Sequence, residues 1–257
     1  MSTRPLIGVQ LYTLRDKIED ANFGMAKTLR EVAALGYEGV EFGGSYGEMD
    51  AASLKPLLDE LNLKTFSLHT GIDALQDSFD RVAEDALLLD ARYVAVAYSG
   101  EEYRSREGAI TLGKTLNELG AKLNSSGIQL LYHNHDFEFA RYDDEYMLDI
   151  VYANSDEKLV KLEVDTFWVN RAGVDPASYI RQYSGRVPLV HLKDASESGD
   201  VIFAPVGAGT MKWDEVFAAA EAGGTVAYIV EQDQTVGDSL EAVRISIENL
   251  KKMGKLG

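Results

Sequence analysis

Short runs of β-branched and aromatic residues alternate along the chain with longer segments that carry apolar residues at helical spacing. The alternation repeats eight times, which is typical of successive βα units. The expected strands are residues 6–12, 37–42, 63–69, 93–98, 128–133, 159–165, 187–192 and 226–231. The expected helices are residues 23–34, 51–61, 77–89, 103–125, 143–153, 176–183, 213–222 and 239–253.

Residues typical of helix ends stand at the boundaries of these segments. Gly36, Gly127 and the pair 223–224 each precede an expected strand, where a left-handed residue ends a helix. Asp238 and Pro176 stand where helices are expected to begin. Because no Pro- or Ser-rich linker interrupts the pattern, residues 1–257 are predicted to form one domain.

Eight βα units with right-handed crossovers close naturally into a (β/α)8 TIM barrel, and this is the predicted α/β fold. The length of 257 residues agrees with it, since such barrels typically need roughly 250 residues. An open nucleotide-binding sheet is the alternative. It usually carries a G-x-G-x-x-G turn after its first strand, and residues 12–16 (YTLRD) contain no glycine.

Acidic and imidazole side chains gather at the C-terminal ends of the expected strands: Glu41, His69, His133, Asp165, His191 and Glu231. All four histidines, at positions 69, 133, 135 and 191, lie at or just beyond such an end. Because residues two apart on a strand share a face, His191 lies beside Lys193, and Glu231 beside Asp233. Active sites of barrels lie at this end, so we expect one shared site.

A cluster of carboxylates inside a barrel predicts a cation, because each unpaired buried charge would cost several kcal/mol. We therefore expect one divalent metal ion per chain. The available ligands are carboxylates and imidazoles, since the chain has no cysteine. This set favours Mn²⁺ or Mg²⁺, and Zn²⁺ and Co²⁺ also suit it.

The composition argues against two classes of partner. The formal charge of −17 disfavours nucleic acid and anionic membrane surfaces, which attract Lys- and Arg-rich patches. The first apolar segment, residues 6–12, is too short for a signal peptide or a membrane span. With no cysteine as well, the expected location is cytoplasmic.

Four segments near the expected strand ends carry a family resemblance: 132–139 (YHNHDFEF), 162–169 (LEVDTFWV), 190–194 (VHLKD) and 230–233 (VEQD). They resemble the sugar phosphate isomerase/epimerase family of xylose isomerase-like TIM barrels, which also includes tagatose epimerases, inosose dehydratases and endonuclease IV. Further similarity lies at 36–42, 67–69 and 205–209, so the resemblance covers nearly the whole chain. These motifs are specific for the superfamily rather than for one substrate.

The resemblance implies a metal held by a Glu, an Asp, a His and a Glu after the fifth to eighth strands. The last three correspond to Asp165, His191 and Glu231. The first does not map cleanly, because His133 stands where many relatives have the Glu. Either His133 is itself the ligand or Glu138 reaches back to the metal, and we favour Glu138.

By the same resemblance, the activity is that of an isomerase or epimerase that removes a proton next to the carbonyl of a sugar and forms an enediolate. Glu231, His133 and His135 are the expected catalytic groups. Glu41, His69, Trp168 and Lys193 are candidates for contact with the sugar, although each also has a structural explanation. Glu41 could pair with Lys193 or an arginine, and Trp168 could simply cover the barrel.

Other activities remain compatible with these residues. Loss of the expected Glu argues against direct epimerase chemistry, and the second candidate is a lyase or dehydratase acting on keto-glycosides or inososes, with His133 or His135 expelling the leaving group. Endonuclease IV-like cleavage disagrees with the negative charge and the few histidines. A barrel that binds sugar without turnover is the non-enzyme alternative. The substrate is expected to lack phosphate, because only residues 207–209 (GAG) could form a glycine-rich phosphate loop, and the family allows a homodimer.

Overall fold

The protein is a closed barrel of eight parallel strands, which confirms the predicted (β/α)8 fold. The computed structural model describes residues 4–197 and 202–256, so the prediction of one domain extends slightly beyond the described residues. The barrel strands are β1 (Leu6–Gln10), β2 (Gly39–Phe42), β3 (Lys64–Gly71), β4 (Tyr93–Tyr98), β5 (Gln129–His133), β8 (Val160–Asp165), β9 (Leu189–Leu192) and β12 (Ala227–Val230). The ring closes because β1 pairs with both β2 and β12.

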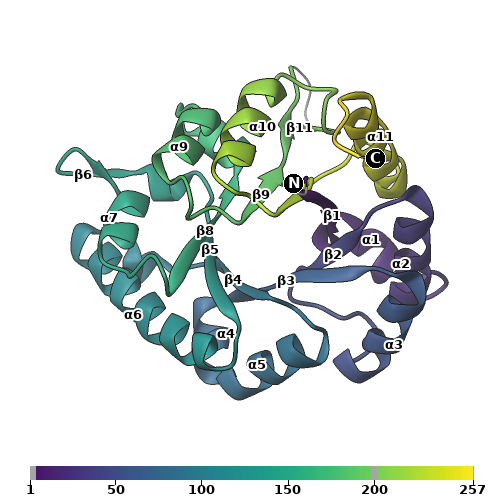
Figure 1. Ribbon diagram of the computed structural model, residues 1–257, viewed down its shortest axis with the longest axis horizontal. Coiled ribbons are helices and arrows are strands. Elements are labelled where there is room, and N and C mark those ends of the chain that lie inside the picture. The colour runs from purple at the N-terminus through teal and green to yellow at the C-terminus, as the bar shows by residue number, and fades with distance from the viewer. Residues whose placement is uncertain (1–3, 198–201, 257) are drawn as a thin grey trace.

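Helices surround the ring of strands on its outer side (Figure 1). They are α1 (Arg15–Ile18), α2 (Gly24–Leu35), α3 (Ala51–Leu61), α4 (Ile72–Asp77), α5 (Phe79–Leu88), α6 (Arg106–Ser125), α7 (Met147–Ala153), α8 (Thr166–Arg171), α9 (Pro176–Gln182), α10 (Trp213–Ala222) and α11 (Ser239–Lys252). Short 3-10 turns are η1 (Leu11–Leu14), η2 (Glu101–Tyr103) and η3 (Phe137–Phe139). Among the described residues, no helix combines the length and apolar character needed to cross a bilayer.

The helix ends lie where the capping residues predicted them. Gly36 closes α2 with φ of 93°, and Gly127 and Gly224 adopt positive φ in the turns before β5 and β12. Asp175 accepts a hydrogen bond from the Ser178 amide at the start of α9, where Pro176 is the first helical residue. Left-handed glycines and side-chain caps satisfy the polar groups that a helix leaves open at its ends.

The expected helix 143–153 begins too early. Asp143 and Asp144 have φ of 50° and 69° and form the turn between two short strands, β6 (Arg141–Tyr142) and β7 (Glu145–Tyr146). Two consecutive residues at positive φ are typical of a tight hairpin turn, which Asp tolerates better than most residues. The helix α7 therefore starts only at Met147.

Two apolar clusters hold the barrel together. The larger lies between strands and helices and includes Leu29, Val40 and Leu116. A smaller one fills the barrel interior and includes Phe66, Leu131 and Ile229. Glycine is needed beside Phe66, because a Cβ atom at Gly39 would lie 2.6 Å from its ring.

The C-terminal rim of the barrel is asymmetric. Above β2, β3 and β4, the interior positions nearest the rim hold the small residues Gly43, Gly71 and Ala97. Above the strands from β5 round to β12, they hold polar side chains that include His135 and Lys193. The space at Gly71 is open, because a Cβ atom there would meet no heavy atom within 4 Å, whereas a Cβ atom at Gly43 would lie 2.9 Å from Tyr12 Cβ.

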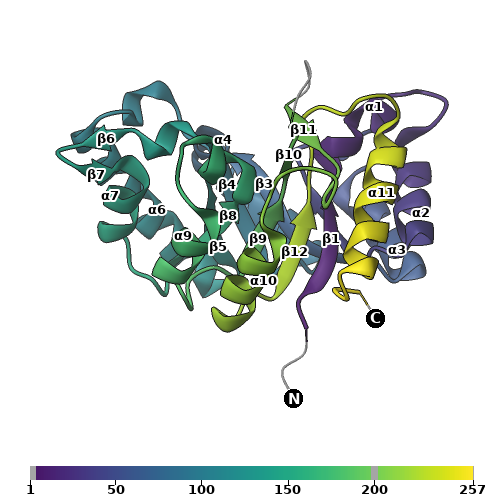
Figure 2. The same cartoon turned by 90° about the horizontal axis from the view of Figure 1, so that it is seen from above.

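Loops and short hairpins rise above this rim. Figure 2 shows the hairpin of β10 (Asp194–Ala195) and β11 (Phe203–Ala204) beyond the ends of β9 and β12. The Asp194 carboxylate accepts hydrogen bonds from the amides of Gly207, Gly209 and Met211, which fixes the following loop. The hairpin and its loop therefore form one wall around the rim.

Candidate metal centre and active site

Four side chains converge inside the C-terminal end of the barrel: His133, Asp165, His191 and Glu231. Each offers one ligand atom, and these atoms all lie within 4.8 Å of one another. The residues come from β5, β8, β9 and the end of β12, which are consecutive in the ring. The structure thus brings together the three residues that the resemblance gave as ligands, with His133 beside them.

A second group shares two of these histidines. His69, His133, Glu163 and His191 also have ligand atoms within 4.8 Å of one another. Glu163 Oε2 lies 2.6 Å from His69 Nε2 and 3.4 Å from His191 Nε2. Glu163 was not among the residues predicted from the sequence, although it lies two residues before Asp165 on the same strand. The alternation of strand faces was the signal that could have found it.

Glu41 lies below these groups as a buried counter-charge. Its Oε2 atom is 2.7 Å from His191 Nε2 and 2.9 Å from His69 Nε2. Gln10 donates a hydrogen bond to the same oxygen at 2.8 Å, and the Ser67 hydroxyl donates to the other. Glu41 therefore pairs with histidines, not with Lys193 or an arginine as the structural alternative proposed.

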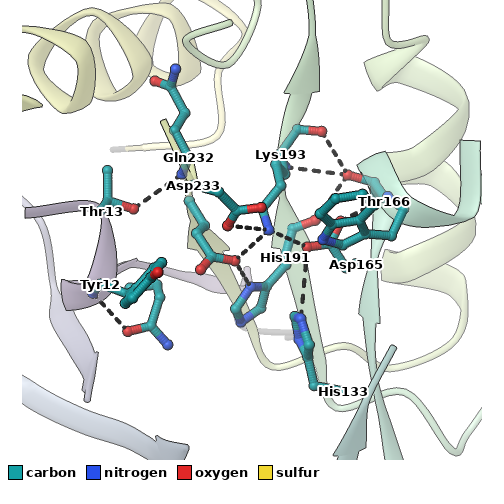
Figure 3. Close-up of polar contacts among 12 residues, drawn as sticks. Tyr12, Thr13, His133, Asp165, Thr166, His191, Lys193, Gln232 and Asp233 are labelled. Atoms are coloured by element: carbon teal, nitrogen blue, oxygen red, sulfur yellow. Dashed lines mark hydrogen bonds and ion pairs between the residues drawn. The ribbon is translucent and has the colours of Figure 1, made fainter. Parts of the chain in front are cut away.

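The ammonium group of Lys193 lies among three carboxylates (Figure 3). Its Nζ atom is 2.9 Å from Asp165 Oδ2, from Glu231 Oε2 and from Asp233 Oδ1. The side chain of Lys193 is 1% exposed, so water screens these ion pairs very little. Two of the three carboxylates are also candidate metal ligands, and the ammonium holds the position of a cation between them.

The charges of the cluster shift its pKa values strongly. Burial raises the pKa of Glu41, but the positive charges of His69 and His191 outweigh burial and hold this pKa well below its usual value. Burial lowers the pKa of His69, but Glu41 and Glu163 raise it to about 10. Burial also lowers the pKa of His191, but the charges of Glu163 and Glu41 outweigh burial and raise this pKa well above its usual value. Burial and the charge of His191 both lower the pKa of His133, which keeps this imidazole neutral.

The donor set fits a divalent cation. Glu163 Oε1 and His133 Nδ1 are buried, and neither has a hydrogen-bond partner among the described residues. In formal charge, five carboxylates face three cations here: Glu41, Glu163, Asp165, Glu231 and Asp233 against His69, His191 and Lys193. Buried charge of one sign is costly unless it is compensated, so the excess of carboxylates favours an ion. Imidazole and carboxylate ligands suit Mn²⁺ and Zn²⁺.

Glu138 lies outside both ligand groups. Its carboxylate accepts one hydrogen bond from the Tyr132 hydroxyl at 2.9 Å and one from the His135 amide at 2.8 Å. Burial raises the pKa of Glu138 to about 7, and the bond from Tyr132 only partly opposes this. The expectation that Glu138 completes the ligand set does not agree with this arrangement, which brings His133 to the other three residues instead.

A cavity of about 480 Å³ opens above the cluster. Five of the residues singled out from the sequence line it: His69, His133, His135, Lys193 and Glu231. Asp233 and the exposed rings of Tyr12 and Tyr98 line it as well. A cavity of this size with a few convergent polar groups is typical of sites for small molecules.

Trp168 and Glu41 do not line this cavity. The Trp168 ring packs against His135, with ring centroids 5.5 Å apart, and the Lys193 ammonium lies 5.5 Å from the Trp168 centroid. Trp168 thus packs against His135 and Lys193, which both line the cavity. This position agrees with the structural explanation of Trp168.

Metal binding is expected to release protons. At neutral pH His69 and His191 hold protons, because their pKa values are raised, whereas an imidazole ligand must be neutral. Falling pH then weakens metal binding, and about one proton should leave for each ion bound at pH 7. Titration calorimetry in two buffers of different ionisation enthalpy measures this number. Identical heats in both buffers would contradict the assigned protonation.

The fold and the cluster define a class: a (β/α)8 barrel with a candidate metal site of histidines and carboxylates at its C-terminal rim. The chain belongs to the xylose isomerase-like TIM barrel family, whose model matches residues 29–253. This finding confirms the resemblance that the motifs carried.

The chain is similar to several proteins of known name. An inosose dehydratase of Clostridium beijerinckii is 25% identical over 189 residues, which cover 65% of this chain and 62% of the relative. A sugar phosphate isomerase/epimerase of Parabacteroides distasonis superposes with a TM-score of 0.83 at 22% identity, over 99% of this chain and 96% of the other. A zinc-bound structure of the IolI protein gives a TM-score of 0.73 at 15% identity, over 98% and 99%. At these identities the two structures establish the shared fold.

Proposed function

We propose that the protein is a metal-dependent dehydratase that acts on a keto-sugar or a keto-cyclitol such as an inosose. The observation that carries the proposal is the grouping of His133 with Asp165, His191 and Glu231, with Glu138 turned away. The resemblance gives epimerases a Glu at the position of His133, where it serves as both ligand and base. Without that carboxylate the site retains a metal set but lacks the base that the resemblance gives to epimerases.

The proposed ligands are His133, Asp165, His191 and Glu231, and the ion would polarise the carbonyl oxygen of the substrate as a Lewis acid. Two histidines among four ligands favour Mn²⁺ or Zn²⁺ over Mg²⁺. The zinc of the IolI structure supports this choice by analogy. Lys193 must give up two of its three carboxylates to the ion, and it keeps Asp233 as a partner.

His135 lines the cavity and belongs to neither ligand group, so it stays available for proton transfer. We assign to His135 the removal of the proton from the carbon next to the carbonyl. His135 then gives this proton to the hydroxyl on the neighbouring carbon, which leaves as water while a carbon–carbon double bond forms. Glu231, expected from the sequence to be catalytic, then serves as a ligand at the cavity floor.

The substrate is proposed to lack phosphate. Residues 207–209 form the only glycine-rich loop that the sequence suggested for phosphate. The amides of Gly207 and Gly209 donate hydrogen bonds to the Asp194 carboxylate at 2.9 and 3.1 Å. These donors are therefore occupied within the protein. The described residues that line the cavity include one Lys and no Arg, which supports a neutral sugar.

Epimerisation is the second candidate, and one observation favours it. His135 and Glu231 both face the cavity, from β5 and β12, which two other strands separate in the ring. A proton could leave to one of these groups and return from the other. The name of the Parabacteroides distasonis structure supports the same reaction.

The two reactions separate in one experiment. The Mn²⁺-loaded protein is incubated with keto-sugars, keto-glycosides and inososes in D₂O, and NMR scores carbon-bound deuterium. Elimination gives a new enone or dione absorption, whereas epimerisation gives deuterated epimer without it. Neither product from any substrate would contradict the proposal and support a barrel that only binds sugar.

His135→Gln is expected to lower kcat by about 10²- to 10⁴-fold, the usual contribution of one general base, with the metal retained. Metal content and kcat are measured on the same preparation. Asp136→Asn is the matched control, because the neighbouring Asp136 pairs with Arg171 away from the cavity. Equal rates in His135→Gln and the wild type would remove His135 from the reaction.

A further inference from the structure

A second cavity of about 510 Å³ adjoins the first. The two share Gly44, His69, Thr70 and Gly71 in their walls. The second cavity extends outward from the ends of β2 and β3 towards α5. One ligand could therefore occupy both cavities without any change in the fold.

Glycine keeps the junction between the cavities open. Gly71 has φ of −76°, which any residue adopts, so backbone strain does not require glycine there. A Cβ atom at Gly71 would meet no heavy atom within 4 Å. Tyr98, the strand partner of Gly71 on β4, is 49% exposed beside this open space. The junction between the two cavities therefore lies beside the Tyr98 ring. A large side chain at position 71 would narrow it.

The lining of the second cavity combines apolar and polar groups. Phe42, Leu68 and Val82 contribute apolar surface, and Arg81 and Asp85 contribute charged groups. Arg81 forms no ion pair with any described residue, so its guanidinium remains available to a ligand. Apolar walls with a few placed hydrogen-bonding groups suit a sugar ring, which has apolar faces and hydroxyl edges.

We propose that the second cavity binds a second sugar ring of the substrate, joined by a glycosidic bond to the keto ring that lies over the metal centre. This inference rests on the proposed function for the position of the keto ring. It names the substrate class as a keto-disaccharide or another two-ring keto-glycoside. Gly71 determines the specificity, because its missing side chain lets the glycosidic link pass.

The test compares two substrates in three proteins. The substrates are a keto-disaccharide and the one-ring keto-sugar with the same reacting ring, and the proteins are wild type, Gly71→Phe and Gly71→Ala. Gly71→Phe is expected to lower kcat/KM for the two-ring substrate, mainly through KM, by at least about tenfold more than it lowers kcat/KM for the one-ring substrate. Gly71→Ala, which adds only a Cβ in open space, should have a much smaller effect than Gly71→Phe.

Arg81→Met tests the far end of the cavity without filling the junction. Loss of a hydrogen bond from a charged group should lower kcat/KM for the two-ring substrate by roughly tenfold and leave the one-ring substrate unchanged. Arg30→Met on α2 is the control, since Arg30 pairs with Glu60 on the outer surface. Equal effects of Gly71→Phe on both substrates, or a wild-type preference for the one-ring substrate, would overturn the proposal.

A separate binding measurement keeps the proposed function and this inference apart. Ligand-detected NMR follows an unoxidised disaccharide with the metal-loaded wild type and with Gly71→Phe. If the wild type binds the disaccharide and Gly71→Phe does not, the second-ring site is supported even when no substrate is turned over. Absence of turnover would contradict only the dehydratase proposal. Absence of disaccharide binding to the wild type, with one-ring turnover intact, overturns the second-ring site alone.

Discussion

Asp165→Asn is expected to lower the affinity for the divalent ion by at least about 100-fold and kcat by at least about 10³-fold. Asp165 is fully buried, and the substitution removes its negative charge from a ligand set of four. The fold should persist, because the Asn oxygen can still accept the hydrogen bond that Asp165 Oδ1 takes from the Trp168 amide. Lys193 also keeps Glu231 and Asp233 as partners.

The chain contains a matched control for this substitution. Asp175 is also an Asp at a helix start, and it accepts a hydrogen bond from the Ser178 amide at 2.8 Å. Asp175→Asn makes the same chemical change away from the cluster, so metal content and rate should both stay at the wild-type level. Metal analysis, circular dichroism and kcat are measured for both variants. Full metal content in Asp165→Asn would show that the ion is held elsewhere.

The barrel and most of the cluster could be predicted because both depend on local sequence. Strand faces alternate with a period of two, and strand ends are marked by the glycines and caps of the adjacent helices. These rules placed His191 and Glu231 at one rim, and the structure brings them within 2.8 Å. Glu163 was not predicted, because it lies two residues before the end of its strand and not at the end itself.

The surroundings of Glu138 and Lys193 could not be predicted in the same way. Glu138 lies in a 3-10 turn, and its direction depends on Tyr132, Ser99 and the path of the chain after β5. Lys193 could have reached Glu41 by charge alone, but it contacts Asp165 and other carboxylates of neighbouring strands. Side chains of this length choose among several partners, and the choice depends on the three-dimensional register of the strands.

Lys193→Met is expected to destabilise the metal-free protein by about 3–5 kcal/mol, the usual cost of removing one partner from buried ion pairs. The three carboxylates around the ammonium would face one another without a cation between them. Burial lowers the pKa of Lys193, but Asp165, Glu231 and Asp233 outweigh burial and raise it, so the wild-type side chain is charged at neutral pH. Thermal unfolding without metal should therefore begin at a lower temperature, by roughly 2–4 °C for each kcal/mol lost in a protein of this size.

Added metal should restore most of the stability that Lys193→Met loses. This result would show that the Lys193 ammonium occupies the position of the metal ion, whereas the loss of an ordinary structural lysine would not be restored by metal. The ammonium contacts Asp165 Oδ2 and Glu231 Oε2, so it competes with the ion for two ligands, and its removal should tighten metal binding. Saturating metal stabilises only the folded state, so it should raise the unfolding temperature of Lys193→Met more than that of the wild type. Lys158→Met, on the exposed surface, should behave as the wild type with and without metal. If Lys193→Met binds the ion more weakly than the wild type, Lys193 supports the metal site and does not compete for it.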